Sequence, residues 1–191
     1  MLIQALERHG AAVLSGDDFD RFVNMLVDPV EKRIRPDHVG QSAEVLLRRA
    51  GIQHDRQVRL VVLPAGLEQL AGPLGREKLL PVLSLFTVHD DDEGFAVCHQ
   101  VLDNDGAGHT AIIHTSNQAR VQRFGLEMPA SRILVNAPGV QGTMGLSTGL
   151  EPSMTVGCGT FGGNSTTDNV TYTHLLNIKR VAFGATEQRA A

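Results

Sequence analysis

Residues 81–88 read PVLSLFTV, residues 110–115 read TAIIHT, and residues 132–136 read RILVN. Each run has the length and the aliphatic and β-branched content of a strand. Residues 90–104 and 115–128 lie between these runs, and each has the length of an amphipathic helix. Strands that alternate with helices at this spacing form right-handed βαβ units. We therefore predict an α/β fold with a mainly parallel sheet and flanking helices.

The two helical segments carry signals at their N-terminal ends. Asp90–Asn104 begins with an acidic turn, which is favourable at the positive end of the helix dipole. Thr115 and Gln118 have the spacing of a capping box, so we expect the second helix to begin there and to extend to Met128.

Residues 1–63 continue the alternation of helices and strands towards the N-terminus. The run Val58–Leu63 is apolar throughout and rich in β-branched residues, which is typical of a strand buried on both faces in a parallel sheet. Gly10 and Gly51 follow helical patterns and are typical of helix C-termini. We therefore expect helices at residues 2–9, 15–26 and 40–50, a strand at residues 58–63, a short apolar piece at residues 11–14, and a polar connector between Pro29 and Pro36.

Composition limits the possible classes of protein. The chain has 191 residues, of which 42% are hydrophobic and 20% charged, as in one ordinary globular domain with or without an appendage. A net charge of −4 without a basic cluster argues against nucleic-acid binding. No apolar run reaches the length of a bilayer span, so we expect no membrane association. The two cysteines have neither CxxC spacing nor a disulfide framework, which favours a reducing, cytoplasmic setting.

Residues 153–178 read SMTVGCGTFGGNSTTDNVTYTHLLNI and are unusually rich in glycine. Such density indicates that the backbone passes close to another group or adopts positive φ angles. Gly157, Gly159 and Gly162 match the spacing of a dinucleotide-binding fingerprint, but they do not follow the first strand of a βαβ unit and no acidic residue lies about 20 positions later. We interpret the segment as a loop packed against an active site or a neighbouring domain.

Several single residues could carry chemistry. Cys158 lies between glycines and could be a nucleophile, although a small residue that fills a tight loop is the favoured interpretation. Cys98 shares a helix face with apolar residues and reads as a core thiol. The histidines have no spacing that predicts a shared metal, so we expect no metal site. Glu77 precedes a strand, where a carboxylate could accept hydrogen bonds from ribose hydroxyls or could be a surface ion-pair partner.

Four stretches together carry a family resemblance. They are REKLLPVL (76–83), GHTAIIHT (108–115), RILVNAP (132–138), and the Gly-rich segment that continues into HLLNIK (174–179). In order and spacing they resemble the C-terminal catalytic region of CoA-acylating aldehyde dehydrogenases of the acetaldehyde type, including the aldehyde dehydrogenase half of bifunctional alcohol/aldehyde dehydrogenases. The resemblance covers nearly the whole chain and is closest from residue 70 onward.

The resemblance implies an NAD(P)-dependent oxidoreductase. In this family a cysteine thiolate attacks a short aldehyde, hydride passes to NAD or NADP, and coenzyme A releases the acyl group from the thioester. Family members carry the nucleophile and the dinucleotide-binding domain in the region that would lie upstream of Met1. We therefore expect this chain to be a C-terminal fragment with no catalytic residue of its own, inactive alone. Acetaldehyde is the default substrate, and sulfoacetaldehyde or another short aldehyde stays open.

The resemblance also implies roles for individual residues. Glu77 matches the glutamate that holds the nicotinamide ribose, and Leu79 matches the apolar residue that packs near the nicotinamide. Asn136 and Phe161 fall where family members line the aldehyde pocket, and we place Cys158 with them. The expected organisation is a partial catalytic domain at residues 1–170, with an oligomerisation strand and polar tail at residues 171–191. Within that segment, Leu175–Phe183 resembles the strand that joins an oligomerisation sheet, so we expect a homo-oligomer.

Two rival interpretations remain at this stage. The chain could be a non-catalytic interaction domain that uses its terminal strand to associate with a partner, or a small thiol enzyme that uses Cys158.

Overall fold

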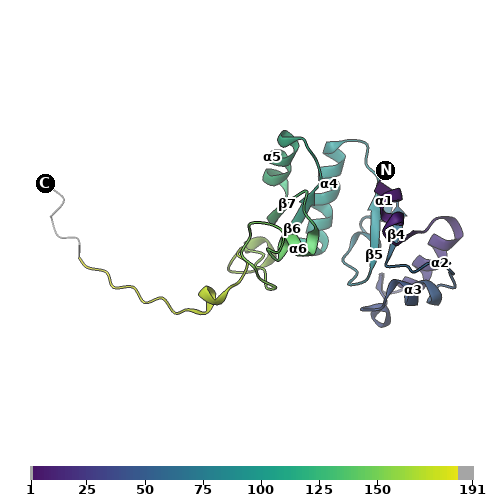
Figure 1. Ribbon diagram of the computed structural model, residues 1–191, viewed down its shortest axis with the longest axis horizontal. Helices are drawn as coiled ribbons and strands as arrows, with labels where there is room; N and C mark the ends of the chain where they lie inside the picture. The colour runs from purple at the N-terminus through teal and green to yellow at the C-terminus, as the bar shows by residue number, and fades with distance from the viewer. Residues whose placement is uncertain (1, 185–191) are drawn as a thin grey trace.

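The computed structural model describes residues 2–184, which form parallel β-sheets flanked by helices (Figure 1). The predicted α/β class is therefore confirmed. The parallel strands lie in two sheets, however, and not in the single sheet that the sequence pattern suggested. One sheet has the order β1-β4-β5 and the other consists of β6 and β7, with all neighbours parallel. Figure 1 shows the two sheets in separate lobes of the molecule.

The N-terminal lobe is built around strand β4. Its elements are α1 (Leu2–Arg8), β1 (Ala11–Val13), α2 (Gly16–Leu26), α3 (Ala43–Arg49), β4 (Leu60–Ala65) and β5 (Val82–Phe86). Val61, Val62 and Leu63 are fully buried, so both faces of β4 are covered as the continuous apolar run predicts. Phe22 and Leu26 of α2 pack in the same core, which fixes that helix against the sheet.

The second lobe contains one βαβ connection, in which a helix joins its two parallel strands. Its elements are α4 (Asp91–Val101), the π-helical turn η4 (Leu102–Gly106), β6 (Gly108–Ile113), α5 (Gln118–Glu127), β7 (Ala130–Val135) and α6 (Gly139–Thr143). Phe95 of α4 and Phe124 of α5 meet edge to face with ring centroids 5.3 Å apart. Both aromatic rings belong to the core of this lobe.

The polar connector after α2 contains a strand pair that the sequence did not predict. Strands β2 (Val27–Asp28) and β3 (Arg33–Ile34) pair in antiparallel register. The Asp28 carboxylate accepts hydrogen bonds from the backbone N–H groups of Val30 (2.8 Å) and Glu31 (3.0 Å), and these bonds lower the pKa of Asp28. The connector is therefore an Asx-type turn that joins two very short strands.

The N-terminus of α5 differs from the prediction. The N-cap is Asn117, whose side-chain oxygen accepts a hydrogen bond from the backbone N–H of Arg120 (3.2 Å). The hydroxyl of Thr115 instead accepts from the N–H of Asn117 at 3.1 Å. The capping box at Thr115 and Gln118 was therefore wrong, because Asn117 lies closer to the first helical turn and satisfies its free N–H groups.

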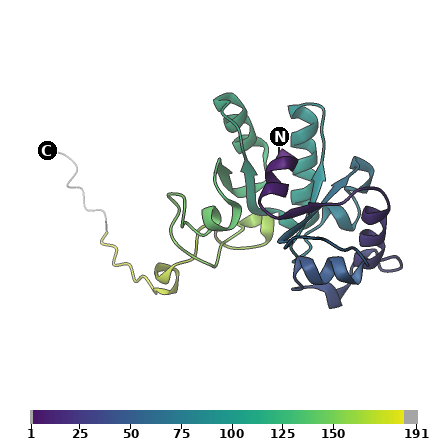
Figure 2. The ribbon, with the colours of Figure 1, turned by 45° about the vertical axis from the view of Figure 1, so that its right-hand side comes forward.

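The predicted strand at residues 175–183 does not form. Tyr172–Leu175 is a short 3₁₀ helix, and residues 176–184 have no regular structure. Figures 1 and 2 show this segment extending away from both lobes. A strand requires a neighbouring edge for its N–H and C=O groups, and the described chain offers none there. Residues 185–191 of the predicted polar tail lie outside the described residues.

The helices of residues 2–184 are all too short or too polar to cross a bilayer.

Candidate functional site

A cavity of about 590 Å³ lies between strands β5 and β6. Within the described chain, β5 pairs only with β4 and β6 only with β7, so the cavity separates two sheet edges that are unpaired. The loop at residues 74–80, the turn η4 and residues His109 and Thr110 of β6 complete its walls. Glu77 and Leu79 both line this cavity, so the structure brings together the two residues predicted to contact a cofactor.

Asp105 of η4 anchors the loop that carries Glu77. Its carboxylate accepts a hydrogen bond from the backbone N–H of Glu77 at 3.1 Å and pairs with the guanidinium of Arg76 at 3.0 Å. The Glu77 carboxylate itself is exposed and takes part in no ion pair within residues 2–184. This arrangement argues against Glu77 as a surface ion-pair partner in this chain, and it leaves both carboxylate oxygens available to a ligand.

Leu79 has an unusual backbone for a leucine. Its φ angle is +50°, in the left-handed region that branched side chains rarely adopt, and its side chain is 65% exposed. Such a conformation costs on the order of 1–3 kcal/mol and persists only where the surroundings impose it. Here the backbone C=O of Leu79 accepts a hydrogen bond from the N–H of Gly40 (3.3 Å). The loop thus holds an apolar side chain exposed at the wall of the cavity.

Lys78 lies between these two residues, and the sequence analysis did not single it out. Its Nζ donates hydrogen bonds to the backbone oxygens of Leu74 (2.8 Å) and Arg76 (3.0 Å). Burial lowers the pKa of Lys78 to about 8, although the charge of Asp105 opposes this shift. No sequence pattern predicts this arrangement, because the carbonyl oxygens converge only after the 3₁₀ turn Pro73–Gly75 has formed.

The Gly-rich loop packs against the first residue of β6. A Cβ atom on Gly108 would lie 1.9 Å from the carbonyl oxygen of Cys158, and the same oxygen accepts a hydrogen bond from the N–H of Gly162 at 3.2 Å. The expected close backbone approach is therefore present. Cys158 is half-buried and Phe161 is 69% exposed, and neither lines the cavity beside Glu77.

Arg132 connects this loop to the sheet. It is 4% exposed and donates hydrogen bonds to the backbone oxygens of Thr167 (3.0 Å) and His109 (3.0 Å) and to the hydroxyl of Thr110 (3.3 Å). This role was not predicted, although an arginine inside the apolar run RILVN is a visible signal of a buried, hydrogen-bonded charge.

Asn136 lies at the other end of the two-stranded sheet. It follows β7 with a φ angle of +52°, and its side chain exchanges hydrogen bonds of 2.9 Å with both the N–H and the C=O of Thr115. Because β6 and β7 are parallel and each has six residues, Asn136 is about 20 Å from the end that contacts Cys158. The structure thus places Cys158 and Phe161 in one loop and Asn136 elsewhere.

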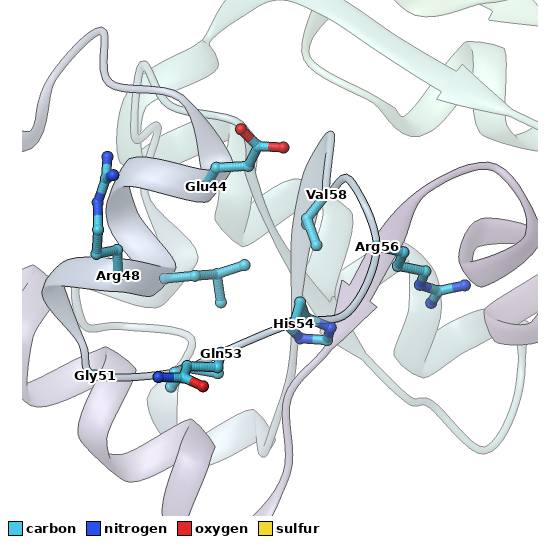
Figure 3. A pocket seen from close by; sticks show the side chains of 9 residues that line it. Glu44, Arg48, Gly51, Gln53, His54, Arg56 and Val58 are labelled. Carbon is cyan, nitrogen blue, oxygen red and sulfur yellow. The ribbon is translucent and has the colours of Figure 1, made fainter.

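A second cavity of about 460 Å³ lies beside α3 and has apolar walls formed by Leu47, Ile52 and Val58. In Figure 3 the side chains of Arg48 and Arg56 point away from each other on opposite sides of it. The Arg56 guanidinium donates to the backbone oxygens of Glu7 (3.1 Å) and Ala11 (3.1 Å). The charged groups of this cavity therefore do not converge on a common point.

The two cysteines lie in different surroundings, and the potential metal ligands are dispersed over the described part of the chain. No group of three His, Cys, Asp or Glu residues within residues 2–184 is arranged to hold a metal ion. Cys98 packs against the core of the second lobe, and burial raises the pKa of its thiol. Cys158 engages neighbouring residues through its backbone, with its N–H donating to the side-chain oxygen of Asn164 at 2.9 Å.

Proteins that this chain resembles in sequence and in structure are named as aldehyde dehydrogenases. The chain is 31% identical over 159 residues to a sulfoacetaldehyde dehydrogenase of Acholeplasma sp and 32% identical over 179 residues to the bifunctional aldehyde-alcohol dehydrogenase of Escherichia coli (strain K12). The crystal structure of an acetylating aldehyde dehydrogenase from Geobacillus thermoglucosidasius superimposes on 99% of this chain with a TM-score of 0.88 and 33% identity. No family model matches the chain.

These relatives are much longer than this chain. The matches include 83% and 91% of the chain but only 33% of the sulfoacetaldehyde dehydrogenase and 20% of the bifunctional enzyme. The structural match likewise covers 41% of the Geobacillus protein.

Proposed function

We propose that this chain, a homologue of one part of the acylating aldehyde dehydrogenases, forms the cofactor-facing wall of the catalytic domain in such an enzyme. The complete enzyme would convert a short aldehyde and coenzyme A to an acyl-CoA, with NAD or NADP as the hydride acceptor. We place it in the cytoplasm. Acetaldehyde is the default substrate, and the relative named sulfoacetaldehyde dehydrogenase keeps that aldehyde as the alternative.

The cavity between β5 and β6 is the observation that carries this proposal. Its loop presents a free carboxylate at Glu77 and an exposed leucine at Leu79, two positions apart. This pair fits the nicotinamide riboside half of a dinucleotide, because a carboxylate can accept charge-assisted hydrogen bonds from two ribose hydroxyls while an apolar side chain contacts the ring. The bound nicotinamide would supply the hydride acceptor.

The residues of this chain would position groups and would not form the covalent bond to the aldehyde. Asp105 fixes the loop of Glu77 through the backbone N–H of that residue, and Arg132 fixes the Gly-rich loop that carries Phe161. We assign the nucleophilic thiolate to a part of the protein outside this chain. Asn136, Cys158 and Phe161 remain proposed members of the aldehyde pocket. We accordingly expect no NAD(P)H formation when the chain alone receives acetaldehyde, coenzyme A and cofactor.

A chimera tests the proposal. This chain would replace the matching segment of the Geobacillus acetylating aldehyde dehydrogenase, which has the same fold over 99% of the chain. We expect the chimera to form NADH from acetaldehyde only when coenzyme A is present. A folded chimera of normal assembly size without any CoA-dependent activity would contradict the proposal. Activity of the isolated chain that the substitution Cys158→Ser abolishes would instead favour the thiol-enzyme interpretation.

A further inference from the structure

We propose that Lys78 is an acylation site, whose side-chain amine takes the acyl group from an acyl thioester such as acyl-CoA. The inference goes beyond the proposed cofactor contact of Glu77 and Leu79, and it rests on the proposed function for the identity of the acyl donor and for the effect on cofactor binding. Three groups of observations support it: the hydrogen bonds of the amine, the charges around it, and its access to a cavity.

The hydrogen bonds of Lys78 suit a neutral amine. A neutral amine has two N–H donors and one lone pair, whereas an ammonium group has three donors. The backbone oxygens of Leu74 and Arg76 accept two hydrogen bonds from Nζ, at 2.8 and 3.0 Å. With both N–H groups held in this way, the neutral form keeps a lone pair that is directed away from the two carbonyl oxygens.

The charges around Lys78 do little to retain its proton. Within residues 2–184 no carboxylate pairs with Nζ at 4.0 Å or less, and Asp105 is already bonded to Arg76 and to the N–H of Glu77. The other ionisable side chains of the cavity are Glu77 and His109. Because burial lowers the pKa of Lys78 to about 8, about half of these amines are neutral at pH 8, compared with under about 1% at the ordinary lysine pKa.

Lys78 is also accessible to a ligand. It lines the cavity of about 590 Å³ described above and a smaller cavity of about 270 Å³ that is lined by the same loop. Leu79, Leu80 and Phe86 give the larger cavity apolar walls that can accept a short acyl chain.

The reaction needs no additional reagent. The Nζ lone pair attacks the thioester carbonyl carbon, a C–N bond forms, and the C–S bond breaks. The coenzyme A thiolate leaves and takes the proton that the nitrogen loses, so the products are an amide and free coenzyme A. An acylated Lys78 keeps only one N–H and can no longer bond to both carbonyl oxygens. Its neighbours are Glu77 and Leu79, so we expect acylation to disturb the loop and to weaken cofactor binding, as feedback from the acyl-CoA product.

The test uses the full chain and acetyl-CoA. The chain contains three lysines, Lys32, Lys78 and Lys179, of which Lys32 and Lys179 are exposed and serve as internal controls. Acetylation at each lysine is followed at pH 8 by peptide mass spectrometry, with the N-terminal amine mapped separately. We expect Lys78 to be acetylated at least about tenfold faster than either control, because a larger fraction of its amine is neutral. Greater exposure cannot explain that order, since the controls are the more exposed side chains.

Two further measurements make the result decisive. In urea well above the unfolding midpoint of the chain the preference for Lys78 should disappear. In a Lys78→Arg variant the rates at Lys32 and Lys179 should stay unchanged. The proposal is overturned if either control lysine reacts as fast as Lys78 in the folded chain, or if Lys78 is not acetylated. Because the labelling needs no enzymatic turnover, a negative result would leave the chimera assay unaffected, and an inactive chimera would leave the labelling result standing.

Discussion

Lys78, Asp105 and Arg132 hold the loops around the two unpaired sheet edges, and each acts mainly on backbone groups. Lys78 and Arg132 donate to carbonyl oxygens, while Asp105 accepts from a backbone N–H. The positions of Glu77 and of the Gly-rich loop therefore depend on side chains that hold the backbone in place.

Lys78 should make the stability of the chain depend on pH. Below about pH 8 the amine is protonated in both the folded and the unfolded chain, and folding carries the cost of burying the charge. Between about pH 8 and the unfolded value of 10.5, only the unfolded chain keeps the proton, so the free energy of unfolding should rise with pH. Urea titrations should show that the free energy of unfolding rises over this range for the unmodified chain and not for Lys78→Met.

The Lys78 measurement has a matched control. Lys32→Met removes the same charge from an exposed site, and its urea midpoint should follow that of the unmodified chain at every pH. A Lys78→Met curve that runs parallel to the unmodified chain from pH 8 to pH 10.5 would show that the amine is not destabilised by burial.

Arg132 should contribute strongly to stability. Arg132→Met would remove the donor to the backbone oxygens of Thr167 and His109 in a partly buried site, at a cost of about 1 kcal/mol for each lost hydrogen bond. Chemical denaturation should show this loss, and limited proteolysis should cut first in the Gly-rich loop. Arg48→Met removes an exposed guanidinium and should change the free energy of unfolding by less than about 0.5 kcal/mol. Equal stability of the two variants would show that Arg132 does not hold the Gly-rich loop against the sheet.

Among the elements, the buried parallel strands were the easiest to predict, whereas the short strand pair β2–β3 and the segment at residues 175–183 were not predicted correctly. The continuous apolar run Val58–Leu63 predicted a strand that is buried on both faces. Strand β4 is covered on both faces, so this prediction is confirmed. The pair β2–β3 escaped prediction because it has two residues per strand and is held by the Asp28 carboxylate. The role of Lys78 was not predicted either. Its Nζ donates hydrogen bonds to two backbone oxygens that come together only in the folded loop.

The contact between β6 and the Gly-rich loop gives a prediction for a pair of glycines. Gly108→Ala places a methyl group 1.9 Å from a carbonyl oxygen at a φ of +74°, so it should destabilise the chain by more than about 2 kcal/mol. Gly125→Ala lies in α5 with no atom within 4 Å of the new Cβ, and it should stabilise the chain by about 0.5–1 kcal/mol. Thermal unfolding would separate the two, and a neutral Gly108→Ala would show that the loop packs elsewhere.

The whole molecule leaves apolar surface uncovered at its C-terminal end. Leu175, Val181 and Phe183 are 85%, 77% and 91% exposed on a segment without regular structure. Exposed apolar segments associate readily, and an edge strand supplied by a second copy would satisfy their backbone groups. We expect the chain to be a dimer or larger, held in part by residues 175–183. Light scattering should show a smaller species for a chain that ends at Thr173, whereas an unchanged mass would exclude this segment from assembly.

The central claim is that Glu77 and Leu79 contact the cofactor in the complete enzyme. A substitution of Glu77 tests this claim most directly. In the chimera with the Geobacillus enzyme, Glu77→Gln removes the charge that would hold the ribose hydroxyls, a difference of about 1.5–3 kcal/mol. We predict that kcat/KM for the CoA-dependent oxidation of acetaldehyde falls by about 10- to 100-fold while the melting temperature stays unchanged. Glu44→Gln, an exposed acid beside the other cavity, should leave both values intact. Unchanged kinetics in Glu77→Gln together with a lowered melting temperature would contradict the account, because Glu77 would then have only a structural role.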